Sequence, residues 1–217
     1  MNVRRWKSNI FIFYMEYRDF YTGIAEAATE FLPFSDIRKK MWYHGRSVND
    51  DTFSLDYVGS EQANDQEGPG FYFTNALDDA RKYAGPAGSI LLCKIKYVIP
   101  RLLSSRAKPS DSVIARLIKR SPDKLDTLSN FAEDPNQAYY MALRTYREYD
   151  TAKDAYQIIA NDFYKGNSTG YLQALRQYYD GHLVERGLGV KHLVVYRPDI
   201  IQIINKFKIN TKVNPQI

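Results

Sequence analysis

The feature that most limits how this chain can fold is the order of its strand-like and helix-like segments. Short apolar or aromatic runs separated by turn residues fill 41–98, and strand patterns return at 182–196. Between them, residues 109–178 carry apolar side chains at three- and four-residue steps, the spacing of helices. A doubly wound sheet needs strands and helices that alternate regularly. The sequence therefore predicts an α+β fold in which a helical block interrupts a set of strands.

Local signals place the individual elements. We expect strands at 41–44, 71–73, 89–98, 182–184 and 191–196, the last two joined as a hairpin by the turn Gly187-Leu188-Gly189. Thr74 or Asn75 is expected to cap a helix that runs through Tyr83 and stops at Gly85-Pro86. Four further helices are expected within 109–178. The first carries Val113, Ile114, Leu117 and Ile118 on one face, the second starts at Pro135, and the third and fourth are marked by apolar residues at 155–163 and 171–175. An amphipathic helix is expected at 10–32 and a closing segment at 199–207.

Composition and charge exclude several classes of protein. The net charge of +5 favours acidic partners such as a nucleotide, but no dense Lys/Arg stripe marks a nucleic-acid surface. Cys93 is the single cysteine, so no internal disulfide forms, and its apolar surroundings indicate a buried side chain and a reducing cytoplasm. No apolar stretch has transmembrane length, and neither a phosphate-binding P-loop nor a Cys/His metal constellation is present, so we expect no membrane and no metal.

The first motif that carries chemistry is Trp42-Tyr43-His44-Gly45. A histidine at the end of a strand can point its imidazole into a cleft. A glycine beside it lets a ligand approach the backbone closely, so that the main-chain N–H and C=O could pair with a planar carboxamide. A structural histidine bonded within the protein is the other interpretation of the same residues.

The second motif is Gly68-Pro69-Gly70-Phe71-Tyr72-Phe73-Thr74, a glycine-rich loop that leads into an aromatic strand. Tyr72 faces the opposite side of the strand from Phe71 and Phe73, so one side can enter a core while Tyr72 lines a cleft. Tyr83 follows about three helical turns after the strand. Two tyrosines placed in this way could hold a flat aromatic ring by stacking.

Together these motifs resemble the diphtheria-toxin/poly(ADP-ribose) polymerase branch of the ADP-ribosyltransferases, in particular the small transferase domains of phages and mobile elements. The resemblance covers 42–98 and resumes, more loosely, at 179–204. It implies an ADP-ribosyltransferase-like split antiparallel β-sandwich, two facing sheets around a cleft, with the side chains of His44 and Tyr72 as neighbours on its floor. The expected division is an N-terminal helical segment at 1–40 and a transferase-like domain at 41–210, with a helical insertion at about 105–178.

The resemblance also implies roles for individual residues, with NAD⁺ as co-substrate. His44 would bind the adenosine-side ribose, and Gly45 would pair with the nicotinamide amide through its backbone. Tyr72 and Tyr83 would stack on the nicotinamide ring, and Thr74 would offer a hydroxyl. The expected NAD⁺-binding set is His44, Gly45, Arg46, Tyr72, Phe73, Thr74 and Tyr83, and the expected catalytic set is His44, Tyr72 and Asp180.

Cleavage of the nicotinamide–ribose bond also calls for a carboxylate, because positive charge develops on the sugar. Asp180 is the first candidate and Glu185, near the hairpin turn, is the second. This sequence departs from the family at two positions. Arg46 stands where the branch has a small hydroxyl residue, and His192 stands where the polymerases have their acidic residue.

The function that the resemblance implies is mono-ADP-ribosyl transfer from NAD⁺ to a macromolecular acceptor, with a host protein favoured over a nucleic acid. A toxin or effector of phage or mobile-element type, acting in the cytoplasm of a host, fits this description. An inactive NAD-fold binding protein, suggested by His192 in the acidic position, and an NAD⁺ glycohydrolase are the alternatives. The sequence leaves the acceptor, the number of ADP-ribose units and the oligomeric state open.

Overall fold

A computed structural model of the chain describes residues 41–47, 51–58, 67–96 and 101–209. Over these residues the fold is α+β, as the order of the segments predicts. The helix expected at 10–32, and with it the whole N-terminal segment 1–40, lies outside the described residues. None of the helices that the structure describes is long and apolar enough to cross a bilayer.

In the part of the chain that the structure describes, seven strands form one hydrogen-bonded sheet in the order β4-β5-β6-β2-β1-β3-β7. Their bounds are β1 Trp42–Arg46, β2 Phe71–Thr74, β3 Ser89–Ile95, β4 Leu102–Leu103, β5 Gly181–Gly187, β6 Val190–Val195 and β7 Ile201–Lys208. All neighbouring pairs are antiparallel except β4 and β5, which run parallel. The expected hairpin is β5–β6, and the expected closing segment is strand β7.

The sheet has a weak seam between β1 and β2. These two strands are paired at Tyr43 and Thr74 only, whereas β1 pairs with β3 along its whole length and β2 does so with β6. The strands therefore do not form the two separate facing sheets that we expected. They form two well-paired groups, β4-β5-β6-β2 and β1-β3-β7, that meet at one residue pair.

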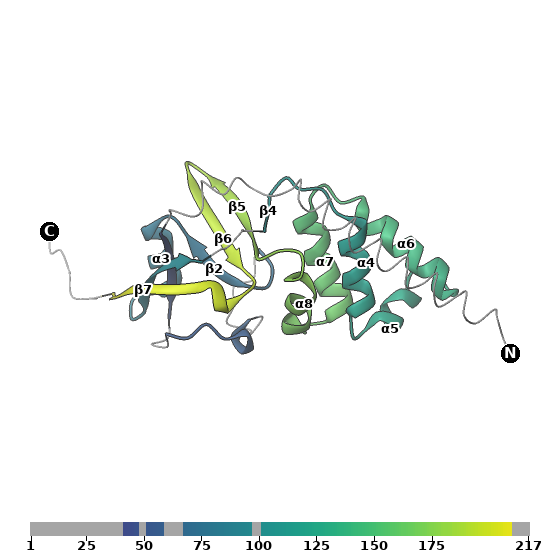
Figure 1. Cartoon of the computed structure of the whole chain (residues 1–217), viewed down its shortest axis with the longest axis horizontal. Coiled ribbons are helices and arrows are strands. Elements are labelled where there is room, and N and C mark those ends of the chain that lie inside the picture. The colour runs from purple at the N-terminus through teal and green to yellow at the C-terminus, as the bar shows by residue number, and fades with distance from the viewer. Residues whose placement is uncertain (1–40, 48–50, 59–66, 97–100, 210–217) are drawn as a thin grey trace.

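Six α-helices of the described residues accompany the sheet. Helix α3 (Leu77–Ala84) packs on β1, β2 and β3. The others lie between β4 and β5 in the chain and gather on the side of the sheet where these two strands lie (Figure 1). They are α4 Asp111–Arg120, α5 Lys124–Ser129, α6 Pro135–Arg147, α7 Ala152–Tyr164 and α8 Ser168–Leu175, and two short 3₁₀ helices span Leu55–Tyr57 and Pro198–Ile200. One continuous core joins this helical block to the strands.

The two ends of the helical block meet. Strand β4, which precedes the block, lies beside the start of β5, which follows it. The main-chain N–H of Asp180 donates to the carbonyl of Arg101 at 2.8 Å, and the N–H of Arg101 donates to the Asp180 carboxylate at 3.2 Å. The helices therefore leave the sheet and return to it at almost the same place.

The start of α3 differs from the expectation. Its N-cap is Ala76, which makes no side-chain cap, whereas Thr74 belongs to β2. The side chain of Asn75 instead accepts from the N–H of Lys191 and donates to the carbonyl of Gly189. Asn75 thus ties the end of β2 to the β5–β6 hairpin, a long-range use that its local sequence does not reveal.

Candidate functional site

His44 lies at the seam between β1 and β2. Its Nδ1 is 2.6 Å from the carbonyl oxygen of Tyr72, and its Nε2 accepts from Nε of Arg46 at 3.3 Å. This pairing requires a neutral imidazole with its proton on Nδ1. Burial lowers the pKa of His44 to about 4 in spite of the bond to Tyr72, so the ring is neutral at pH 7. The half-buried ring packs on Phe53 and Phe73, with centroids 5.0 and 5.4 Å away.

The side chains of His44 and Tyr72 do not meet as neighbours on a cleft floor. His44 contacts the main chain of Tyr72, and its ring lies with Phe73. Adjacent residues of a strand point to opposite faces, so Tyr72 points to the other face of β2. Arg46, the departure from the family pattern, covers His44 Nε2 and lies 4.9 Å over the Phe53 ring.

Gly45 has a packing reason to be glycine. A Cβ at this position would lie 2.0 Å from the carbonyl oxygen of Ala80 and 2.8 Å from the nitrogen of Ala84. Both atoms belong to the backbone of α3, so the glycine allows this helix to lie directly on β1. The first motif therefore places α3, and with it Tyr83, against the sheet.

The glycine-rich loop shapes the approach to Tyr72. Gly70 has φ +152°, and a Cβ there would lie 2.3 Å from a methyl carbon of Val194. The Tyr72 hydroxyl donates to the carbonyl of Gly68 and accepts from the N–H of Glu67. The hydroxyl thus closes the loop onto its own strand, while the half-buried ring packs against the core.

Four residues from three elements meet on the Tyr72 face of the sheet, and we call them the His192 cluster. They are Thr74 of β2, Asp79 and Tyr83 of α3, and His192 of β6. Thr74 and His192 are register partners. Asp79 Oδ2 lies 3.5 Å from His192 Nε2, and the Tyr83 ring meets the His192 ring edge-on at 6.4 Å. Asp79 and Tyr83 stand one turn apart, so both face His192 from the same side of α3.

Asp180 and Glu185, the two expected carboxylates, lie elsewhere. Asp180 is only 5% exposed and accepts from the guanidinium of Arg101 at 3.0 Å, with Arg197 at 3.5 Å. Its carbonyl pairs with Tyr196, four residues from His192 and so about 13 Å along the strand direction. Glu185 is exposed near the hairpin turn and pairs with Lys191 at 3.2 Å.

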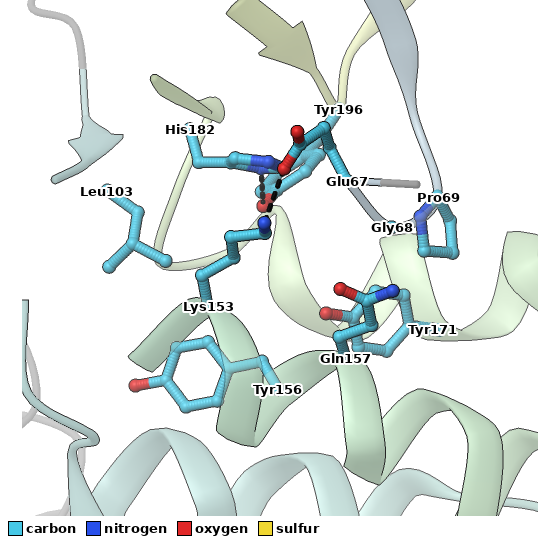
Figure 2. A pocket seen from close by; sticks show the side chains of 10 residues that line it. All are labelled: Glu67, Gly68, Pro69, Leu103, Lys153, Tyr156, Gln157, Tyr171, His182 and Tyr196. Atoms are coloured by element: carbon cyan, nitrogen blue, oxygen red, sulfur yellow. Dashed lines mark hydrogen bonds and ion pairs between the residues drawn. The ribbon is translucent and has the colours of Figure 1, made fainter. Parts of the chain in front are cut away.

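A small cavity with buried charged groups at its wall lies between the sheet and the helical block (Figure 2). Glu67, only 3% exposed, forms ion pairs there with Lys153 of α7 and Arg186 of β5. His182 Nδ1 lies 2.7 Å from the hydroxyl of Tyr196, and burial lowers the pKa of His182 to about 3. The ion pairs of Glu67 connect the segment before β2 to helix α7 and to strand β5.

Two groups at these sites carry no role in the sequence analysis. They are Asp79, which lies beside His192, and Glu67, which pairs with Lys153 and Arg186. The spacing of Asp79 and Tyr83 by four residues is a signal that could have found the first, because the two side chains must share one helix face. The partners of Glu67, Lys153 and Arg186, lie far away in the sequence, so no local pattern predicts these contacts.

Comparison with known proteins adds no further constraint on this site. The chain matches no protein-family model, no curated protein and no solved structure.

Proposed function

We propose that this protein is an ADP-ribosyltransferase that cleaves NAD⁺ at the nicotinamide–ribose bond and transfers ADP-ribose to a macromolecule. The observation that carries the proposal is the meeting of the second motif with β6. Thr74 and Tyr83 lie against His192, the residue that stands in the acidic position of the resembled family. The nicotinamide ring is proposed to bind beside Tyr83, between α3 and the Tyr72 face of β2.

The chemistry suits these groups. Tyr83 is 49% exposed, so one face of its ring is free of the core and can stack on a flat aromatic ligand. His44 lies on the opposite side of the sheet from Tyr72 and Thr74, where the Tyr72 carbonyl and Arg46 hold its ring, so we assign it a structural role outside the proposed nicotinamide site.

Three activities give different results in one assay. The protein is incubated with NAD⁺ labelled in its adenosine part, with and without a lysate, and both free nicotinamide and macromolecule-bound label are measured. Transfer predicts that nicotinamide release rises with lysate and that label appears on a macromolecule. Release into water without bound label indicates a glycohydrolase. The absence of release under both conditions refutes the proposal and leaves a binding protein.

Tyr83→Ala tests where the nicotinamide ring binds. Because Tyr83 is half exposed, this change should leave folding nearly unaffected. Loss of stacking costs on the order of 1 kcal/mol, so NAD⁺ affinity should fall about fivefold, whereas Tyr83→Phe should keep it. Tyr140→Ala is the matched control, because Tyr140 is an exposed tyrosine on α6. Equal affinity of Tyr83→Ala and Tyr140→Ala would contradict the proposed position of the ring.

A further inference from the structure

The His192 cluster contains a carboxylate that the family resemblance does not assign. His192 is 8% exposed, and its Nε2 is buried without a well-formed hydrogen bond to any described residue. Asp79 Oδ2 lies 3.5 Å from this nitrogen, at ion-pair distance. A buried imidazole nitrogen that faces a carboxylate is the arrangement by which an acid orients a histidine for proton transfer.

The other carboxylates considered for this role cannot reach the same place. Asp180 is held by Arg101 and Arg197 at the far end of β6, and Glu185 pairs with Lys191 near the hairpin turn. The Asp79 side chain is 23% exposed and therefore partly shielded from water. Its hydrogen bond from Lys82 holds the pKa of Asp79 below its usual range, so the group is ionised at neutral pH.

We infer that Asp79 and His192 act together in the transfer reaction, with His192 as the catalytic base and Asp79 as the residue that positions it. This inference rests on the proposed function. Asp79 would accept a hydrogen bond from the Nε2–H of the neutral imidazole. Nδ1 would then carry the free lone pair that accepts a proton from the acceptor group. The Tyr83 ring, which meets His192 edge-on, would place the nicotinamide end of NAD⁺ beside that base.

The step balances without another reactant. The bond between ribose C1′ and the nicotinamide nitrogen breaks, and neutral nicotinamide leaves with the bonding electrons. A hydroxyl or amine of the acceptor forms the new bond to C1′ and gives its proton to His192 Nδ1. Asp79 stabilises the imidazolium that results, and the proton then passes to water.

The charges around His192 favour a neutral base at rest. Asp79 and Tyr83 face it from α3, Lys82 pairs with Asp79, and Arg186 acts on it from β5. Burial lowers the pKa of His192, the bond to Asp79 opposes that shift, and Arg186 adds to it. Removal of the Asp79 charge should therefore lower the pKa of His192 further.

Asp79→Asn is the test, and Asp78→Asn is its matched control. Both aspartates lie in the first turn of α3 and pair with a cation three residues later, but Asp78 is exposed and has no contact with His192. Asp79→Asn should lower kcat for nicotinamide release about a hundredfold or more, the contribution typical of a general base, with KM changed less than about threefold. Asp78→Asn should stay within about twofold of wild type.

Two readouts separate this role from a structural one. The acid limb of the pH–rate profile, and the pKa of His192 measured by NMR titration, should both move to lower pH in Asp79→Asn and stay in place in Asp78→Asn. The double variant Asp79→Asn/His192→Gln should be no slower than the slower single variant, because residues that act as a unit are not additive. Unfolding midpoints check that all variants fold.

The outcomes distinguish this inference from the proposed function. If the wild-type protein releases no nicotinamide, both the proposed function and the role of Asp79 and His192 are refuted. If the wild-type protein is active and Asp79→Asn matches Asp78→Asn in rate and pH profile, the role of Asp79 and His192 is refuted while the transferase proposal stands.

Discussion

Substitution of Gly45 by alanine separates two explanations of this glycine: room for α3 to pack on β1, or close approach of NAD⁺ to the backbone. The added Cβ would lie 2.0 Å from the Ala80 carbonyl oxygen, 2.8 Å from the Ala84 nitrogen and 3.0 Å from the Ala80 carbonyl carbon. Since non-bonded contacts are comfortable at about 3.5 Å, α3 must move away by roughly 1.5 Å. All three obstacles are backbone atoms, so no side-chain rotation relieves the overlap.

The expected cost follows from that overlap. Overpacking typically destabilises by about 1–3 kcal/mol, and a rigid helix backbone puts Gly45→Ala near the upper end. The smaller conformational freedom of alanine in the unfolded chain offsets about 0.4–1 kcal/mol of this. We expect a net loss of about 2 kcal/mol, which for a chain of this length lowers the unfolding midpoint by about 4–8 °C.

Urea unfolding followed by circular dichroism measures this loss. Gly88→Ala is an informative companion, because a Cβ there would lie 2.0 Å from the Ala84 carbonyl oxygen at the other end of α3. The double variant should lose less than the sum of the two, since one shift of the helix relieves both overlaps. Ala80→Gly should not rescue Gly45→Ala, because the obstacle is a carbonyl and not a methyl group. A Gly45→Ala protein as stable as wild type but weak in NAD⁺ binding would refute the packing explanation.

Three further changes test the charged groups. Glu67→Gln breaks the buried ion pairs and should destabilise by about 2 kcal/mol in urea unfolding, whereas the exposed Glu185→Gln should stay within about 0.5 kcal/mol of wild type; equal effects would contradict the buried role. His182 has a pKa of about 3 in the fold against 6.5 in the unfolded chain, so only the unfolded chain binds its proton between these values. Stability should therefore fall by about 1.4 kcal/mol per pH unit as pH drops below about 6, and His182→Asn should flatten that slope; an unchanged slope would refute the assignment. Asp180→Asn should cost about 2 kcal/mol of stability but leave nicotinamide release per folded molecule unchanged, and loss of release in a stable protein would instead restore Asp180 as a catalytic group.

The sequence predicts well those elements whose signals are local. The buried face of α4, Val113, Ile114, Leu117 and Ile118, is the set that its spacing indicates, and the β5–β6 hairpin forms around the expected glycine turn. Helix α5 was missed because six residues offer too little periodicity, and only Thr127 and Leu128 of them are buried. Strand β4 was missed because its two residues pair with β5 across the whole helical block.

The candidate site was predictable in parts. The alternation in β2 correctly places Tyr72 on the opposite face from Phe73, but the same alternation separates Tyr72 from His44, because the His44 ring lies with Phe73. The contact of Asp79 with His192 depends on α3 lying close to β6, which in turn depends on the glycine contacts beneath the helix. Such placement is a property of packing, and a linear pattern does not contain it.

The meeting of Arg101 and Asp180 makes the helical block an insertion in the topological sense. A segment whose two ends are already joined by hydrogen bonds can change length without moving the strands that flank it. Because the entropy of closing a loop grows only with the logarithm of its length, the connections between these helices can change length at small cost to the sheet, while the buried core that the helices share with the strands is kept. The outward-facing side of the helical block can therefore diverge among related chains faster than the strands and α3 that it accompanies.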